Sequence, residues 1–180
     1  MMKATGVVRR IDDLGRIVIP KEIRRTMRIR EGDPLEIFTD KDGGVVFKKY
    51  SLMGGLSDFA GQMCETLSKL SGLTAVITDR DNTLAVCGAS RRDLAERAVS
   101  EELEKLMENR QLYVRQPGES GLSVCRDNEK YQITVCAPIL SGGDVLGAVL
   151  FVAEGEDTVG ETETKMIQTA AGFLSRHMEE

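Results

Sequence analysis

The sequence has few residues of the kinds that hold metals or cross membranes. It contains one histidine, His177, and its four cysteines, Cys64, Cys87, Cys125 and Cys136, form no C-x-x-C pair. A zinc site with the usual Cys/His spacing is therefore not expected. No apolar run approaches the roughly 18 residues of a membrane span, and no signal-like apolar segment follows the first residues. We expect no metal, no membrane association, a cytoplasmic and nucleoid-associated location, and reduced, buried thiols.

Positive charge is outnumbered by negative charge overall and is unevenly distributed. The net charge of −5 argues against affinity of the whole chain for nucleic acid. Residues 1–50, however, hold 12 Lys and Arg against 8 Asp and Glu, whereas residues 51–180 hold 12 against 21. This asymmetry indicates separate tasks, one of them with a polyanion. Lys48 and Lys49, at the end of the basic region, are expected to be solvated.

Residues 1–50 have the pattern of two hairpins and a short helix. The expected elements are strands at 5–11 and 16–19, a helix at 21–29, and strands at 34–40 and 45–50. Asp12 and Asp13 lie in the first turn and are interpreted as turn formers rather than metal ligands. Pro20 ends the second strand. The second strand is apolar on both faces, and a region of only 50 residues buries little surface alone. We therefore infer that residues 1–50 close their core as a homodimer.

Residues 57–180 have a different pattern, that of an α+β domain, and follow an expected linker at 51–56. The expected helices are 56–71, 90–107 and 158–178, and the expected strands are 73–79, 83–89, 112–115, 122–126, 131–140 and 145–153. The first and last of these helices carry long apolar stripes. We expect them to pair with copies of themselves, which would join two dimers into a homotetramer.

The segment "TGVVRRIDDLGRIVIPKEIRRTMRIREGDPLEIF", residues 5–38, resembles the DNA-binding module of AbrB-type bacterial transition-state regulators. The resemblance covers nearly all of residues 3–50 and implies a swapped-hairpin β-barrel dimer, in which two chains interleave their strands. The region that follows resembles a GAF domain, an antiparallel sheet with flanking helices, which implies sensing or oligomerisation. Together the two resemblances imply a sequence-specific DNA-binding regulator of transcription, activator or repressor, of sporulation genes in an endospore-forming bacterium.

The arginines gathered in this segment have two interpretations. From composition alone they form a solvated, charged face. Alternatively they dock on duplex DNA, because the guanidinium fork suits both phosphate and the guanine edge. The resemblance favours DNA: Arg9, Arg16, Arg24 and Arg25 match positions that serve DNA binding in the family, and Arg10 occupies a position that is basic there.

Two other functions remain open on the sequence. A GAF-like scaffold can carry a thiol enzyme, which would use Cys125 and Cys136 on adjacent expected strands. Swapped-hairpin regions also occur in antitoxins, although these usually carry a disordered toxin-binding tail. In the main interpretation the protein is not an enzyme and has no catalytic residue and no cofactor. Its partners are double-stranded DNA and further copies of the chain, and binding of a small-molecule ligand by the GAF-like region stays open.

Overall fold

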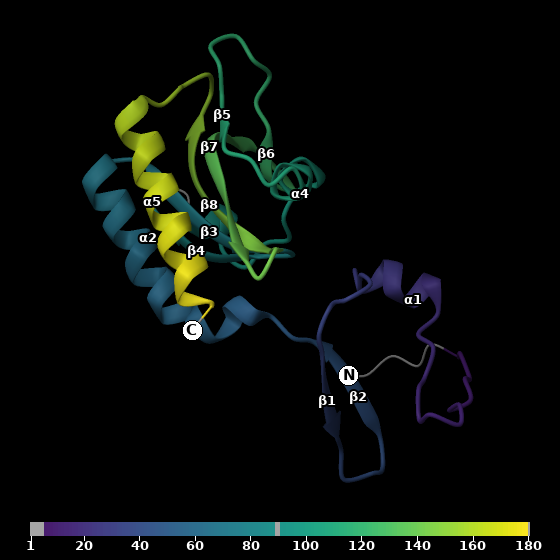
Figure 1. The fold of residues 1–180 in the computed structure, drawn as a ribbon. Helices are drawn as coiled ribbons and strands as arrows, with labels where there is room; N and C mark the ends of the chain where they lie inside the picture. The colour runs from purple at the N-terminus through teal and green to yellow at the C-terminus, as the bar shows by residue number, and fades with distance from the viewer. Residues whose placement is uncertain (1–5, 89–90, 180) are drawn as a thin grey trace. The chain divides into compact units, whose positions relative to one another are not determined.

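The computed structural model describes residues 6–88 and 91–179. The backbone divides into an N-terminal unit, residues 1–50, and a C-terminal unit, residues 51–180 (Figure 1). The first has a two-stranded antiparallel sheet and the second a six-stranded antiparallel sheet with flanking helices. The α+β class expected from the sequence is therefore confirmed.

One short helix and one hairpin make up the regular structure of the N-terminal unit. These elements are α1, Lys21–Thr26, and the antiparallel strands β1, Leu35–Thr39, and β2, Val45–Lys49. The hairpin turns at the predicted Asp-Gly pair, where Gly43 has a φ of 83°. The Asp40 carboxylate fixes the turn by accepting hydrogen bonds from the N–H groups of Asp42 and Gly44, at 3.0 and 2.6 Å.

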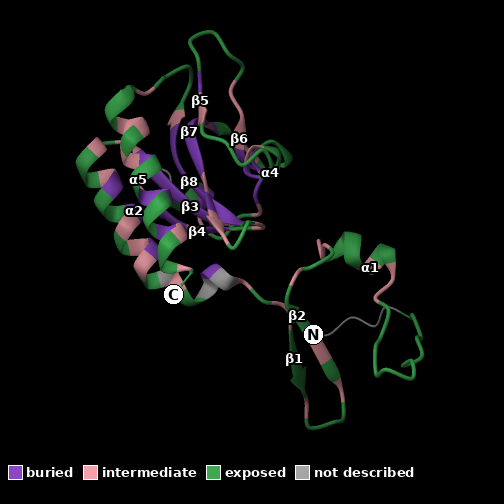
Figure 2. Ribbon diagram, viewed as in Figure 1, coloured by how far each residue is buried: buried purple, intermediate pink, exposed green. Residues whose placement is uncertain are grey.

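The strands expected at 5–11 and 16–19 do not form: within residues 6–20 the structure has a turn and no strand. The apolar side chains of this stretch face solvent, with Val8 87% and Val18 72% exposed. None of residues 6–50 is buried, and Figure 2 shows this unit in the colours of exposed and half-buried residues. Among the described residues no strand pairs with this stretch, so it lacks the ladder hydrogen bonds that would make it a strand.

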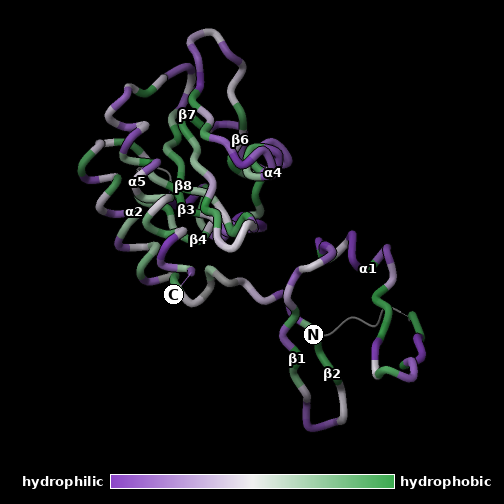
Figure 3. The backbone as a smooth tube through the Cα atoms, viewed as in Figure 1, coloured by the Kyte–Doolittle hydropathy of each residue, from purple (hydrophilic) through white to green (hydrophobic). Residues whose placement is uncertain are grey.

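The sheet of the C-terminal unit has the strand order β4-β3-β8-β7-β5, and β6 also pairs with β7. The strands are β3, Thr74–Asp79; β4, Thr83–Cys87; β5, Tyr113–Val114; β6, Ser123–Cys125; β7, Asn128–Ser141; and β8, Asp144–Glu154. The long hairpin β7–β8 turns at Gly142 and Gly143, both with positive φ, as a two-residue turn requires. It forms the centre of the unit, and much of it is drawn in the colour of hydrophobic residues (Figure 3).

Helices cover both faces of this sheet. On one face α2, Ser57–Ser71, and α5, Glu161–His177, lie side by side (Figure 1). On the other face lie α3, Arg91–Leu94, and α4, Glu101–Glu108. Alternate residues of β8 serve the two cores: Val149 and Phe151 pack under α2 and α5, whereas Ala148, Leu150 and Val152 pack on the opposite side. This double burial explains why β8 reads as a continuous apolar run.

Two segments differ from the sequence-based expectation. Residues 51–56, expected as a linker, hold a 3-10 helix, Leu52–Leu56, whose Met53 is only 1% exposed within the core under α2. The helix expected at 90–107 is two helices, because the chain turns at Glu96, which has a φ of 56°. Residue 89, the expected end of the strand at 83–89, and residue 90, the expected start of the helix at 90–107, lie outside the described residues.

Candidate nucleic-acid interface

The five arginines singled out in the sequence all lie on the surface of the N-terminal unit. Arg9 and Arg10 are neighbours in the extended stretch before the first turn, Arg16 follows that turn, and Arg24 and Arg25 form the last turn of α1. Across residues 6–88 and 91–179, no hydrogen bond or ion pair joins the arginines of the extended stretch to those of α1. The single chain thus exposes these groups without gathering them into one constellation.

The turn at residues 12–16 orients one of these arginines. The Asp12 carboxylate accepts hydrogen bonds from the backbone N–H groups of Leu14, at 3.1 Å, and Arg16, at 2.7 Å. Its second oxygen accepts from Nε of Arg16 at 2.8 Å. These bonds, chiefly those from Arg16, lower the pKa of Asp12 below its ordinary value. Asp12 is therefore a turn former, as predicted, and it aligns the Arg16 guanidinium through Nε.

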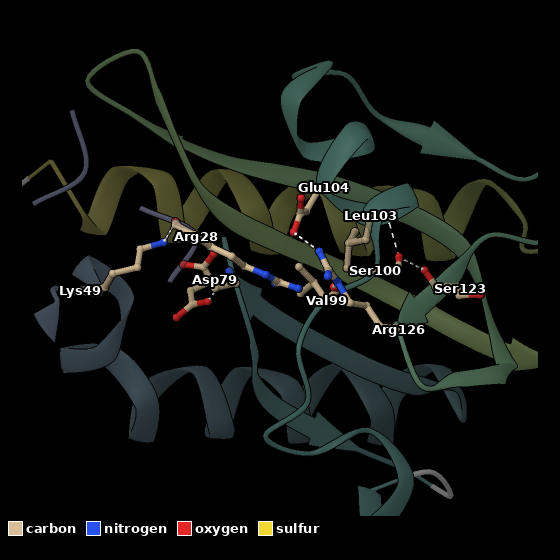
Figure 4. A network of polar contacts seen from close by, with 10 residues as sticks. Arg28, Lys49, Asp79, Val99, Ser100, Leu103, Glu104, Ser123 and Arg126 are labelled. Carbon is tan, nitrogen blue, oxygen red and sulfur yellow. Dashed lines mark hydrogen bonds and ion pairs between the residues drawn. The ribbon is translucent and has the colours of Figure 1, made fainter. Parts of the chain in front are cut away.

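Lys49 has a role that the sequence did not reveal. Its Nζ donates to the carbonyl oxygen of Arg28 at 2.8 Å (Figure 4). It also pairs with the Asp33 carboxylate at 3.3 Å, so it fastens β2 to the chain just after α1. The expectation that it is solvated was wrong, because a lysine at the end of a strand gives no sign of a partner 21 residues earlier. Lys48 is exposed, with Nζ 4.7 Å from the centre of the Phe38 ring.

The geometry does not favour the thiol-enzyme alternative in the C-terminal unit. Cys125 and Cys136 are buried, and they lie on the neighbouring strands β6 and β7 without facing each other, since Cys125 is paired with Asn128 and Cys136 with Tyr113. Burial raises the pKa of Cys125 to about 11 and that of Cys136 to about 12. Both are therefore protonated near neutral pH, whereas a catalytic cysteine acts as the thiolate.

Hydrogen bonds from neighbouring segments hold α4 on the sheet. The Ser100 hydroxyl caps the helix by accepting from the N–H of Leu103 at 3.0 Å, and it donates to the carbonyl oxygen of Ser123 at 2.6 Å (Figure 4). Arg126 donates to the carbonyl oxygen of Val99 at 3.3 Å and pairs with Glu104 at 3.5 Å. These groups are engaged in fixing the fold, so they do not form a ligand site.

The apolar stripes of α2 and α5 face their own sheet, not a second copy as the sequence suggested. Leu67 and Leu174 are buried in the core under the helices. An apolar stripe in the sequence shows that residues share one face of a helix but does not tell which surface that face meets. The sheet β4-β3-β8-β7-β5 supplies that surface within the same chain.

A second apolar surface lies outside this core, where α2 and α5 meet. Phe59 of α2 stacks on Phe173 and His177 of α5, with ring centres 5.6 and 5.3 Å apart. Phe173 is 50% exposed and Leu70, at the end of α2, is 74% exposed. We call this surface the outer helix patch; it consists of the three stacked rings of Phe59, Phe173 and His177. Phe173 and His177 are four residues apart, so both lie on one face of α5.

The described residues lack two other kinds of site. Among the residues that the structure describes, no group of three or more His, Cys, Asp or Glu side chains is arranged to hold a metal ion. None of the described helices combines the length and the apolar character that crossing a membrane requires. The exposed arginines and the outer helix patch are thus the two surfaces that need a functional explanation.

Comparison with known families finds two matches along the chain. A family model described as "Stage V sporulation protein T C-terminal, transcription factor" matches residues 55–179. A second, described as "Antidote-toxin recognition MazE, bacterial antitoxin", matches residues 8–52. The boundary between the two matches falls where the backbone divides into its two units.

Individual relatives match either the whole chain or a part of it. Stage V sporulation protein T of Bacillus subtilis (strain 168) is 49% identical over 179 residues, which are 99% of this chain and 100% of that protein. The transition state regulatory protein AbrB of the same organism is 43% identical over 77 residues, covering 43% of this chain and 78% of AbrB. Among solved structures, the GAF domain of a phosphoenolpyruvate-protein phosphotransferase from Coxiella burnetii matches with a TM-score of 0.52 at 15% identity, over 67% of this chain and 80% of that one. At this identity the last match shows the GAF fold alone.

Proposed function

The chain belongs to the stage V sporulation protein T family of transcription factors, and from that premise we propose how its two units divide the work. The N-terminal unit pairs with a second copy as a swapped-hairpin dimer and binds duplex DNA through its exposed arginines. The C-terminal GAF-like unit joins two such dimers into a tetramer. The complex acts on sporulation genes in the cytoplasm, associated with the nucleoid, as activator or repressor according to the promoter.

The observation that carries the dimer is the lack of any buried residue among residues 6–50. Val8, Ile11, Leu14 and Val18 are all strongly exposed, although their stretch has the composition of strands. A second chain that interleaves its own copy of this stretch would bury those side chains and complete the missing ladders. The resemblance of the same residues to AbrB supports this arrangement.

Dimerisation also places the arginines. Two-fold symmetry doubles the five arginines to ten, and pairing of residues 6–11 with another strand would fix Arg9 and Arg10, whose side chains have no hydrogen bond or ion pair within the described part of the single chain. Arg16 is aligned by Asp12 through Nε, which leaves its two terminal nitrogens to donate to a phosphate or a guanine edge. Arg24 and Arg25 are exposed at the end of α1. The acidic C-terminal unit repels DNA and confines contact to the N-terminal unit.

The test is a salt series of DNA affinity for the parent protein and for Arg16→Ala and Arg24→Ala. Each phosphate contact contributes about −0.9 to the slope of log K against log salt, so one substitution, which removes two contacts per dimer, should flatten the slope by about 1.8. An arginine that reads a base should instead cost about 1–3 kcal/mol per site and relax the sequence preference. Lys48→Ala is the control, because Lys48 carries the same charge in the same unit. If both arginine variants bind like the parent, the exposed arginines are only a solvated face.

The outer helix patch supports the tetramer. Phe173 is half-exposed and stacks on Phe59 of the adjacent helix, so the outer helix patch offers apolar surface that could pair around a two-fold axis. Phe173→Glu should reduce the assembly from tetramer to dimer in sedimentation equilibrium. Leu112→Glu, at a half-exposed leucine before β5, is the matched control and should leave the mass unchanged. A Phe173→Glu protein that keeps the full mass would place the tetramer contact elsewhere.

The alternatives have less support. The antitoxin match covers only residues 8–52, whereas the residues that would form a toxin-binding tail fold into an ordered α+β unit. The buried cysteines with raised pKa values do not favour thiol catalysis, and we propose that the chain is not an enzyme. A small-molecule ligand for the GAF-like unit is not needed for any step described above.

A further inference from the structure

Two cysteines of the C-terminal unit lie against each other between α2 and the edge strand β4. Cys64, in the middle of α2, is fully buried, and its thiol donates to the carbonyl oxygen of Ala75 at 3.1 Å. Ala75 is the residue of β3 that pairs with Cys87 in the sheet. The thiol of Cys87 in turn lies 4.0 Å from the carbonyl oxygen of Gly61, one helical turn before Cys64. Each sulfur thus reaches the backbone immediately beside the other cysteine.

The two thiols differ in access. β4 is an edge strand of the sheet and Cys87 is its last residue, half-buried, so a small oxidant can reach it from solvent. Cys64 is enclosed beneath α2. Burial, together with the adjacent Cys87 thiol, raises the pKa of Cys64 well above its ordinary value. Cys64 therefore stays protonated and unreactive until its neighbour has changed.

We propose that Cys64 and Cys87 form a reversible intramolecular disulfide when the protein meets a peroxide. In the first step the peroxide O–O bond breaks as an S–O bond forms on Cys87, which gives a sulfenic acid and one water. In the second step the Cys64 sulfur attacks the Cys87 sulfur, and the S–O bond breaks as the S–S bond forms. The Cys64 proton and the departing hydroxyl leave as a second water. One peroxide is thereby reduced to two waters, and two thiols are oxidised by two electrons.

The other cysteines do not compete for this role. Cys125 and Cys136 belong to the core on the opposite face of the sheet, and both are buried. The proposed bond joins α2 to β4 and closes a loop that contains β3, so it restricts the unfolded chain without crossing the sheet.

The experiment uses the full chain treated with hydrogen peroxide, then alkylated under denaturing conditions and digested with trypsin without reduction. Trypsin cleaves after Lys69 and Arg80, so Cys64 and Cys87 fall in separate peptides that only a disulfide can hold together. We expect one linked pair, lighter by two hydrogen atoms than the separate peptides, loss of two of the four free thiols, and full recovery with a thiol reductant. Cys125→Ser should form the same pair.

Variants of the pair test the order of the steps. In Cys64→Ser, Cys87 should accumulate as a sulfenic acid trapped by a dimedone probe, whereas in Cys87→Ser the Cys64 thiol should survive peroxide treatment. The proposal is overturned if the parent protein yields Cys87 in a sulfinic form with Cys64 still free, or links Cys87 to another chain. Because this result comes from the parent protein, it holds even if a variant fails to fold.

Discussion

Leu174 offers a sharp test of which surface the last helix buries. It lies on α5, has no exposed surface, and packs in the core under α2 and α5. Leu174→Ala removes a buried side chain and leaves a cavity that the flanking sheet and helices can fill only in part. Comparable substitutions at buried leucines cost about 3–5 kcal/mol, and we expect roughly 3 kcal/mol here.

That loss of stability corresponds to a large shift in the melting temperature. The C-terminal unit spans residues 51–180. At about 2.1 cal/mol/K per residue its unfolding entropy is about 270 cal/mol/K, so a loss of roughly 3 kcal/mol lowers Tm by about 11 °C. Scanning calorimetry of the full chain should show this shift in the transition of the larger unit.

The control is Leu112→Ala. Leu112 is 38% exposed, so its truncation leaves no enclosed cavity and should cost less than about 1 kcal/mol. If Leu174→Ala leaves Tm unchanged but lowers the mass of the assembly, the stripe of α5 meets another chain and not its own sheet. If both substitutions destabilise the protein equally, Leu174 does not pack in the core under α2 and α5.

Two further changes test local parts of the fold. Ser100→Ala removes the cap of α4 and should lower the free energy of unfolding by about 1 kcal/mol. The control Ser120→Ala, at an exposed loop position, should change the free energy of unfolding little. Equal effects of the two substitutions would contradict the capping role of Ser100. The pKa of Asp12 is held below its ordinary value, chiefly by the hydrogen bond from the backbone N–H of Arg16. The ionised carboxylate therefore stabilises the turn at pH values above the unfolded-state pKa. That stabilisation is lost as pH falls through the folded-state pKa. Carbon NMR should show Asp12 titrating below the ordinary range in the parent and closer to it in Arg16→Gln, and an unshifted midpoint in both would exclude the hydrogen bonds as the cause.

The parts of the fold that the sequence predicted are those in which local pattern and burial agree. β7 and β8 were expected because apolar and β-branched residues predominate at 131–140 and 145–153. The break between α3 and α4 was missed because it depends on a distant contact: the Thr83 hydroxyl accepts from the N–H of Arg97 at 3.0 Å. No periodicity in residues 90–107 reports on a partner 14 residues earlier.

The same limit explains what could be predicted of the candidate site. The arginines were found from composition and resemblance, because charged side chains on a basic region need no tertiary partner to be noticed. Their arrangement could not be predicted, because within residues 6–20 the structure has no strand pairing that would order the arginines and no buried residue that would hold them in place. Apolar residues such as Val8 and Val18 are interspersed with the arginines, so the pairing that buries the former also fixes the latter. In the proposed dimer, folding of this stretch and presentation of its arginines to DNA would therefore be one event, and a surface that exists only in the dimer would match an operator only as a pair of half-sites.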